Sequence, residues 1–114
     1  MTMIQLFHGL VDKSTVDIMA FVEDTTGDLI IEGCNSYPDA ENQDDSDEEY
    51  WLRIAKDDKI KLLESLDKSA NSKKGLDALL LKALAKAFNT GSSFNDVRNW
   101  CGTHSIPARF SSFT

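Results

Sequence analysis

The sequence predicts an α+β domain in which three helices pack on one face of a mostly antiparallel sheet. Two segments rich in Val, Ile and Phe flank a glycine-containing turn, and the apolar period changes from two to 3.6 residues near Asp57. A short apolar tail follows the helical part. Strands, then helices, then a last strand is a pattern typical of this class. A length of 114 residues, with 41% hydrophobic and 27% charged residues, fits a single globular domain over 1–114.

The first 35 residues predict strands. Residues 3–10 place Ile4 and Leu6 on one parity, which favours a short strand. Residues 15–23 and 28–35 predict a hairpin, because Asp24-Thr25-Thr26-Gly27 between them has the composition of a tight connection. The 15–23 strand is expected near the middle of the sheet, since its second face is also apolar. The face expected in the core carries Val16, Ile18, Ala20, Val22, Leu29 and Ile31.

An acidic segment follows the hairpin, and we expect a solvated polar loop at about 36–49. Pro38 interrupts regular structure there. Like charges at high density repel one another, so either solvation or a positively charged partner must account for this segment. A calcium loop is the alternative, but the EF-hand spacing with its glycine is missing, so no metal is predicted. The acids are Asp39, Glu41, Asp44, Asp45, Asp47, Glu48 and Glu49.

The chain then returns to regular structure. Residues 50–55 alternate apolar residues with Trp51 and Arg53, which predicts a half-buried strand. Asp57 or Asp58 is expected to cap a helix over about 57–67. The apolar stripe of this helix consists of Ile60, Leu62, Leu63 and Leu66.

Two more helices and a strand complete the prediction. Leucines and alanines at helical spacing predict a core helix over 75–89. Ser92 or Ser93 is expected to cap a third helix over 94–103, with Cys101 on its apolar face. Residues 106–113 predict an edge strand, because a proline near its start cannot donate to a ladder.

The charge is divided unevenly along the chain. Residues 1–50 hold 13 acids and one base, a charge of −12, whereas residues 51–114 hold 11 bases and six acids, a charge of +5. The net charge is −7. This distribution favours a basic partner and argues against direct binding of nucleic acid.

The sequence predicts neither an enzyme nor a cofactor. Cys101 and His104 could meet on one helix face, but no carboxylate is placed to orient the histidine. Phosphate-binding glycine loops, metal-ligand spacings and CxxC motifs are missing. Cys34 and Cys101 are expected to be buried thiols in a reducing compartment. With no leader and no apolar run of membrane-spanning length, a cytoplasmic protein without membrane contact is expected.

Residues 50–113 carry a resemblance to a known class of proteins. The order YWLRIAKDDKIKLLESL, a leucine-rich helix, SFNDVRNWC and then SIPARFSSF resembles small bacterial immunity proteins. These proteins are encoded beside polymorphic toxins, including those of contact-dependent growth inhibition. The resemblance implies a single-domain cytoplasmic protein that binds and blocks the C-terminal domain of a cognate toxin, often a nuclease. It implies no catalytic residue, and it does not cover the acidic N-terminal half.

We therefore expect an immunity protein that neutralises a basic toxin domain through an acidic surface. The expected surface includes the seven acids of the acidic segment together with Trp51 as an aromatic anchor. Tyr50 is a second aromatic candidate, although packing in the core is the alternative for both aromatic residues. The second candidate surface consists of the hairpin acids Glu23, Asp24, Asp28 and Glu32.

Other functions stay open at this point. A nucleic-acid accessory or regulatory module would use basic residues of the second half, and an adaptor or an acidic enzyme subunit is a further option. The oligomeric state and the activity of the toxin are not determined by the sequence. The basic residues are Lys73, Lys74, Lys82, Lys86, Arg98 and Arg109.

Overall fold

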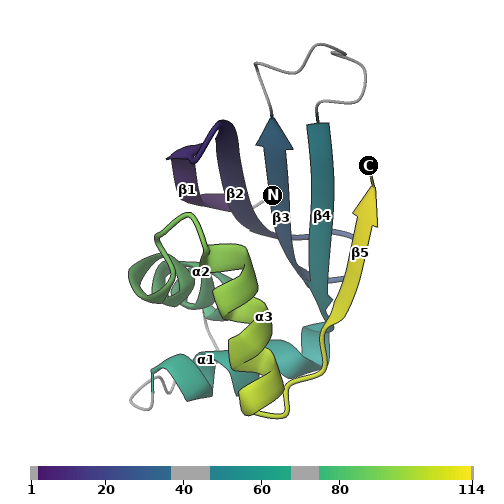
Figure 1. The fold of residues 1–114 in the computed structure, drawn as a ribbon. Helices are drawn as coiled ribbons and strands as arrows, with labels where there is room; N and C mark the ends of the chain where they lie inside the picture. The colour runs from purple at the N-terminus through teal and green to yellow at the C-terminus, as the bar shows by residue number, and fades with distance from the viewer. Residues whose placement is uncertain (1–2, 37–46, 68–74, 114) are drawn as a thin grey trace.

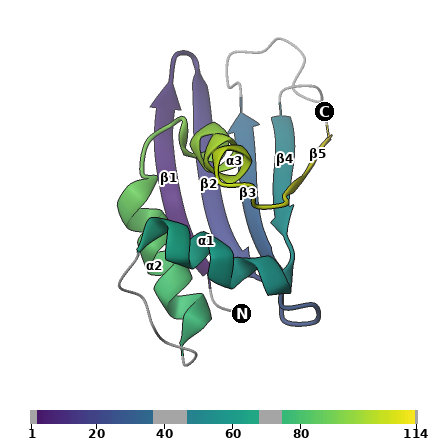
Figure 2. The same ribbon diagram turned by 90° about the horizontal axis from the view of Figure 1, so that it is seen from below.

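The computed structural model describes residues 3–36, 47–67 and 75–113, which form a five-stranded antiparallel sheet and three α-helices. The strands follow one another in sequence order across the sheet, and the helices lie between β4 and β5 in the chain. All three helices cover the same face of the sheet, so the predicted fold class is confirmed (Figures 1 and 2). The elements are β1 (Met3–Val11), β2 (Ser14–Val22), β3 (Leu29–Ser36), β4 (Asp47–Ile54), the 3-10 helix η2 (Lys56–Asp58), α1 (Lys59–Leu66), α2 (Leu76–Ala87), α3 (Ser93–Thr103) and β5 (Arg109–Phe113).

The β2–β3 hairpin has the expected register. Val22 pairs with Leu29, and Ala20 pairs with Ile31. Gly27 has a φ of 76° in the turn, a conformation that residues with a Cβ rarely adopt. Since side chains alternate across a strand, this register places the predicted apolar face entirely on the side of the helices.

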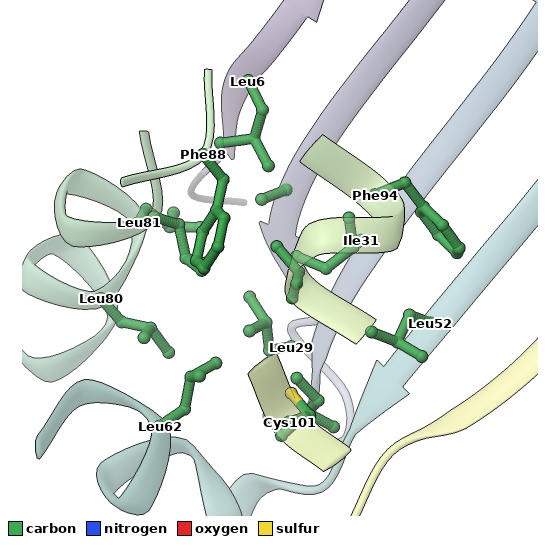
Figure 3. Close-up of a cluster of buried hydrophobic side chains, with 14 of the residues drawn as sticks. Leu6, Leu29, Ile31, Leu52, Leu62, Leu80, Leu81, Phe88, Phe94 and Cys101 are labelled. Carbon is green, nitrogen blue, oxygen red and sulfur yellow. The ribbon is translucent and has the colours of Figure 1, made fainter. Parts of the chain in front are cut away.

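The core lies between the sheet and the helices. Figure 3 shows Leu62, Leu80 and Leu81 of α1 and α2 directed toward Leu29 and Ile31 of β3. All of these side chains are buried, and such burial is the main favourable contribution to folding. We call the helix-covered side of the sheet the inner face and the opposite side the open face.

The acidic loop is shorter than predicted. β3 continues to Ser36 and β4 begins at Asp47, and these two residues are register partners in the sheet. Glu48 and Glu49 therefore belong to a strand, and the prediction of a loop over 36–49 is wrong at both ends. Pairing with β3 provides backbone hydrogen bonds that these polar residues do not signal in the sequence.

Several helix details also differ from the predictions. Asp58 and Ser92 stand at the N-cap positions of α1 and α3, but neither side chain makes a capping hydrogen bond. Ile60 is 43% exposed, so it leaves the predicted apolar stripe, and Lys59 is buried in its place. The long aliphatic stem of a lysine makes such burial possible when its ammonium finds a partner.

The last strand begins later than predicted. Ile106 is buried, and its N–H donates to the Cys101 carbonyl at 2.8 Å. It therefore follows α3 and does not join the ladder, and β5 starts only at Arg109. β2 lies inside the sheet between β1 and β3, as its two apolar faces predicted, and β3 is the middle strand.

Candidate functional site

The open face carries an apolar cluster that no described helix covers. Phe21 of β2, Ile30 of β3 and Trp51 of β4 point to this side. Ile30 is only 4% exposed because Phe21 and Arg53 pair with it on its two sides. A shallow pocket of about 290 Å³ opens over the cluster, and Ser111 of β5 completes its wall. Phe21 and Trp51 stay half-buried and can contact a partner.

Trp51 is held in place by an acid on the neighbouring strand. Its register partner is Glu32, and the indole N–H donates to Glu32 Oε1 at 3.0 Å. A hydrogen bond to a charged acceptor is stronger than one between neutral groups. The indole is therefore oriented before any partner arrives, which lowers the entropy cost of binding through it.

Arg53 forms ion pairs with two acids, Glu23 and Asp28, that flank the turn of the β2–β3 hairpin. Its Nη1 lies 2.8 Å from Asp28 Oδ2 and 3.3 Å from Glu23 Oε1. Hydrogen bonds from this guanidinium lower the pKa of both carboxyls, and Thr26 contributes to the shift at Glu23. The charges of these two acids are thus partly compensated by Arg53, and Glu23 lines the pocket over the apolar cluster.

Two further acids of the open face, Asp17 and Glu49, lie in one row across the sheet, two residues along from Glu32 and Trp51. Asp17 accepts a hydrogen bond from Gln5 Nε2 at 3.0 Å, and His8 Nδ1 lies 3.6 Å from the same carboxylate. Glu49 is exposed and lies between Cys34 and Phe113 across the sheet. Within the described ranges the open face holds carboxylates of five residues against the two guanidinium groups of Arg53 and Arg109. The five acidic residues are Asp17, Glu23, Asp28, Glu32 and Glu49.

A second concave region lies on the inner face, beside α3. This groove has a volume of about 780 Å³. Its lining residues include Glu48 and the aromatic residues Tyr50, Phe94 and Phe110. The Tyr50 ring meets Phe94 edge to face at 4.5 Å between centroids. The Arg98 guanidinium lies 4.1 Å above the centre of the Phe110 ring, a cation–π contact.

Tyr50 has a structural role in this groove. Its hydroxyl donates to Asn35 Oδ1 at 2.7 Å, and its ring occupies the space that a Cβ on Gly33 would need. It packs against the hydrophobic core. Tyr50 therefore behaves as the alternative interpretation expected, as part of the core, whereas Trp51 faces the other side of the sheet.

The structure separates the predicted partner-binding residues into groups. Asp39, Glu41, Asp44 and Asp45 lie outside the described residues, and for Asp47 only the backbone is described. Glu48 and Glu49 point to opposite faces. Asp24 is exposed in the β2–β3 turn. The residues brought together on the open face are Glu23, Asp28, Glu32, Glu49 and Trp51.

Sequence reasoning missed Arg53, Phe21 and Ile30 as members of this site. The alternation of residues 50–55 already gave Arg53 the same parity as Trp51, which is the one signal available. The hairpin register, which would add the other two, depends on pairing across the sheet.

The four predicted basic residues that the structure describes are spread over α2, α3 and β5. Lys73 and Lys74 lie outside the described residues. Lys82 and Lys86 are exposed on α2, while Arg98 lies in the groove beside α3 and Arg109 lies on β5. In the part of the chain that the structure describes, no three His, Cys, Asp or Glu residues gather as metal ligands.

Cys101 and His104, the pair that could meet on one helix face, have different surroundings. Burial raises the pKa of the Cys101 thiol to about 11, so the thiol stays protonated at neutral pH. His104 stacks on Trp100 at 4.1 Å, and its Nδ1 lies 2.9 Å from the Trp100 carbonyl oxygen. His104 is therefore the C-cap residue of α3 and packs against the last turn of this helix.

Comparison with known proteins assigns no family. No family model, no curated protein and no solved structure matches the chain. In the three described ranges, no helix combines the length and the apolar character that crossing a membrane requires. Function must therefore be inferred from the residues themselves.

Proposed function

We propose that this chain is an immunity-type protein of the cytoplasm that binds and neutralises a cognate toxin domain, a basic nuclease, through the open face. The observation that carries the proposal is the composition of this face. An apolar cluster around Trp51 shares this face with carboxylates from β2, β3, β4 and the β2–β3 hairpin. A buried apolar centre with a polar border is the usual anatomy of a protein–protein interface.

Trp51 is the residue that we expect to dominate the binding energy. Tryptophan is enriched among interface residues whose removal costs more than about 2 kcal/mol. Its half-buried ring is held by Glu32 and lies over the described pocket. These contacts fit a residue that is ordered before binding.

The carboxylates explain why a basic partner is proposed. A nuclease surface is basic because it must bind phosphates, and exposed acids on an inhibitor accelerate encounter with such a surface. Glu49 is the open-face acid best placed for this role, since it is exposed and directly continues the acidic segment in the sequence.

The nucleic-acid accessory function has less support. Four of the predicted basic residues are described, and Lys82, Lys86, Arg98 and Arg109 belong to three different elements, while the chain has a net charge of −7. Phosphate binding needs several cations on one surface. Tight binding of duplex DNA at physiological salt would nevertheless favour that function over ours.

A charge-matched pair of variants tests the proposal. Glu49→Lys changes an exposed acid on the open face, and Glu64→Lys changes an exposed acid on α1, so both raise the net charge by two. The binding probe is the purified, catalytically inactive C-terminal domain of the toxin encoded beside this gene. We expect Glu49→Lys to slow association and to reduce its dependence on salt, whereas Glu64→Lys stays near wild type.

Substitution at Trp51 tests the centre of the same surface. Trp51→Ala should accelerate dissociation by about 30-fold or more, which corresponds to about 2 kcal/mol, while Trp51→Phe should retain part of the affinity. Thermal unfolding verifies that both variants fold. Equal effects of Glu49→Lys and Glu64→Lys, or wild-type dissociation for Trp51→Ala, would show that the open face is not the binding surface. The absence of a toxin gene beside this one would contradict the immunity function itself.

A further inference from the structure

The outer edge of β5 is an unprotected sheet edge. β5 pairs with β4 on one side only, and within the described residues no backbone group bonds to its other side. All five of its residues are exposed, including Phe110 at 43% and Phe113 at 69%. Figures 1 and 2 show β5 at the rim of the sheet with no helix beyond it. Such an edge is a template for pairing with another strand.

The opposite edge of the sheet is protected in comparison. β1 has an irregular register between Gln5 and Phe7, and α2 packs against it. Bulges and covering helices are common means by which proteins prevent edge-to-edge pairing. The pairing of β5 with β4 runs without a register shift, and β5 contains neither lysine nor proline.

We propose that β5 pairs with β5 of a second copy of this chain, antiparallel and centred on Ser111, which gives a symmetric dimer with one continuous sheet. The sequence RFSSF complements itself in this register. Arg109 lies opposite Phe113 of the copy, and Ser111 lies opposite its own equivalent. Like charges therefore never stand directly opposite each other, and the two Phe110 rings become diagonal neighbours within reach of one another.

Charge complementarity across the open face favours a second copy as the occupant. Within one chain Arg109 pairs with Arg53, a like charge, and it shares the attraction of Asp28 with that arginine. In the dimer the row across the sheet continues from Arg109 to Phe113 and then to Glu49 of the copy, because Glu49 pairs with Phe113. Arg109 and this glutamate are then two strand spacings apart, about 10 Å, and their side chains can meet over the Phe113 ring. The proposal does not depend on the proposed toxin binding.

Disulfide trapping tests the register without any toxin. Ser111→Cys, in a Cys34→Ser background, places two thiols opposite each other across the two-fold axis, where strand spacing suits a disulfide. Ser112→Cys in the same background is the control, because the two equivalent positions are about 8 Å apart diagonally, too far for a disulfide. We expect the Ser111→Cys protein to form covalent dimers under mild oxidation at least about tenfold faster.

Sedimentation velocity of the unmodified chain provides the second measurement. We expect a monomer–dimer equilibrium that depends on protein concentration, and we expect Ser111→Lys to remove the dimer because two ammonium groups then face each other. Circular dichroism verifies that this variant folds. A wild-type protein that stays monomeric at all concentrations, larger open assemblies, or equal crosslinking at positions 111 and 112 would each overturn the proposal. A monomer whose β5 becomes protected only when the toxin domain is added would assign the edge to a partner strand.

Discussion

The ion pair between the buried Lys59 of α1 and the exposed Asp77 of α2 allows a prediction in which the two partners differ. The Lys59 side chain is 5% exposed, and its Nζ lies 2.6 Å from Asp77 Oδ1. The Asp77 side chain is 41% exposed. The two partners therefore have very different access to water. Removal of Asp77 leaves a buried ammonium group, whereas removal of Lys59 leaves an exposed carboxylate.

The expected costs follow from this difference. Asp77→Ala leaves an ammonium group buried without its carboxylate, which costs about 3 kcal/mol of folding free energy. Lys59→Met keeps an apolar stem of similar length and leaves a carboxylate that water can reach, so we expect a loss below about 1 kcal/mol. The difference of about 2 kcal/mol corresponds to a factor of about 30 in the unfolding equilibrium.

Urea unfolding at neutral pH measures these effects. The double variant Lys59→Met/Asp77→Ala should be more stable than Asp77→Ala alone, because it no longer contains a buried ammonium group without a carboxylate partner. The dependence on urea should keep the same slope, which indicates an unchanged native fold. The reasoning is refuted if Lys59→Met destabilises as much as Asp77→Ala, or if the losses of the two single variants add in the double variant.

Three further predictions concern other parts of the molecule. Gly33→Ala should displace the Tyr50 ring and destabilise the fold by about 1–3 kcal/mol, visible in the same unfolding assay and as altered near-UV circular dichroism; unchanged spectra and stability would contradict the close contact. Cys101, with a pKa of about 11, should resist iodoacetamide at pH 8 until denaturant is added, and peptide mapping would detect any early reaction. Hydrogen bonds from Arg53 lower the pKa of Asp28, so their stabilisation is fully present above the unfolded pKa of about 4 and is lost as pH falls through the lower folded value. Arg53→Met should therefore reduce the loss of stability between neutral and acidic pH, and an unchanged pH profile would argue against this ion pair.

The types of the secondary elements were predictable because they depend on local periodicity. Alternation in residues 15–23 and spacing in residues 75–89 each reflect which face of one element is buried. Element ends were predicted less well, as at Asp47, since a polar residue joins a strand only when a neighbouring strand provides its hydrogen bonds.

The same distinction applies to the candidate site. The sequence by itself determined that acids are concentrated in the first half of the chain and that Trp51 follows them. Only the tertiary structure decided which acids Trp51 meets, because it bonds to Glu32, which is 19 residues away in the chain. Likewise, Arg53 and Asp28 are 25 residues apart, and the register of β3 with β4 brings them to 2.8 Å. Since a shift of one residue in that register would turn every side chain to the other face, the composition of the open face is a property of strand pairing, which local sequence does not encode.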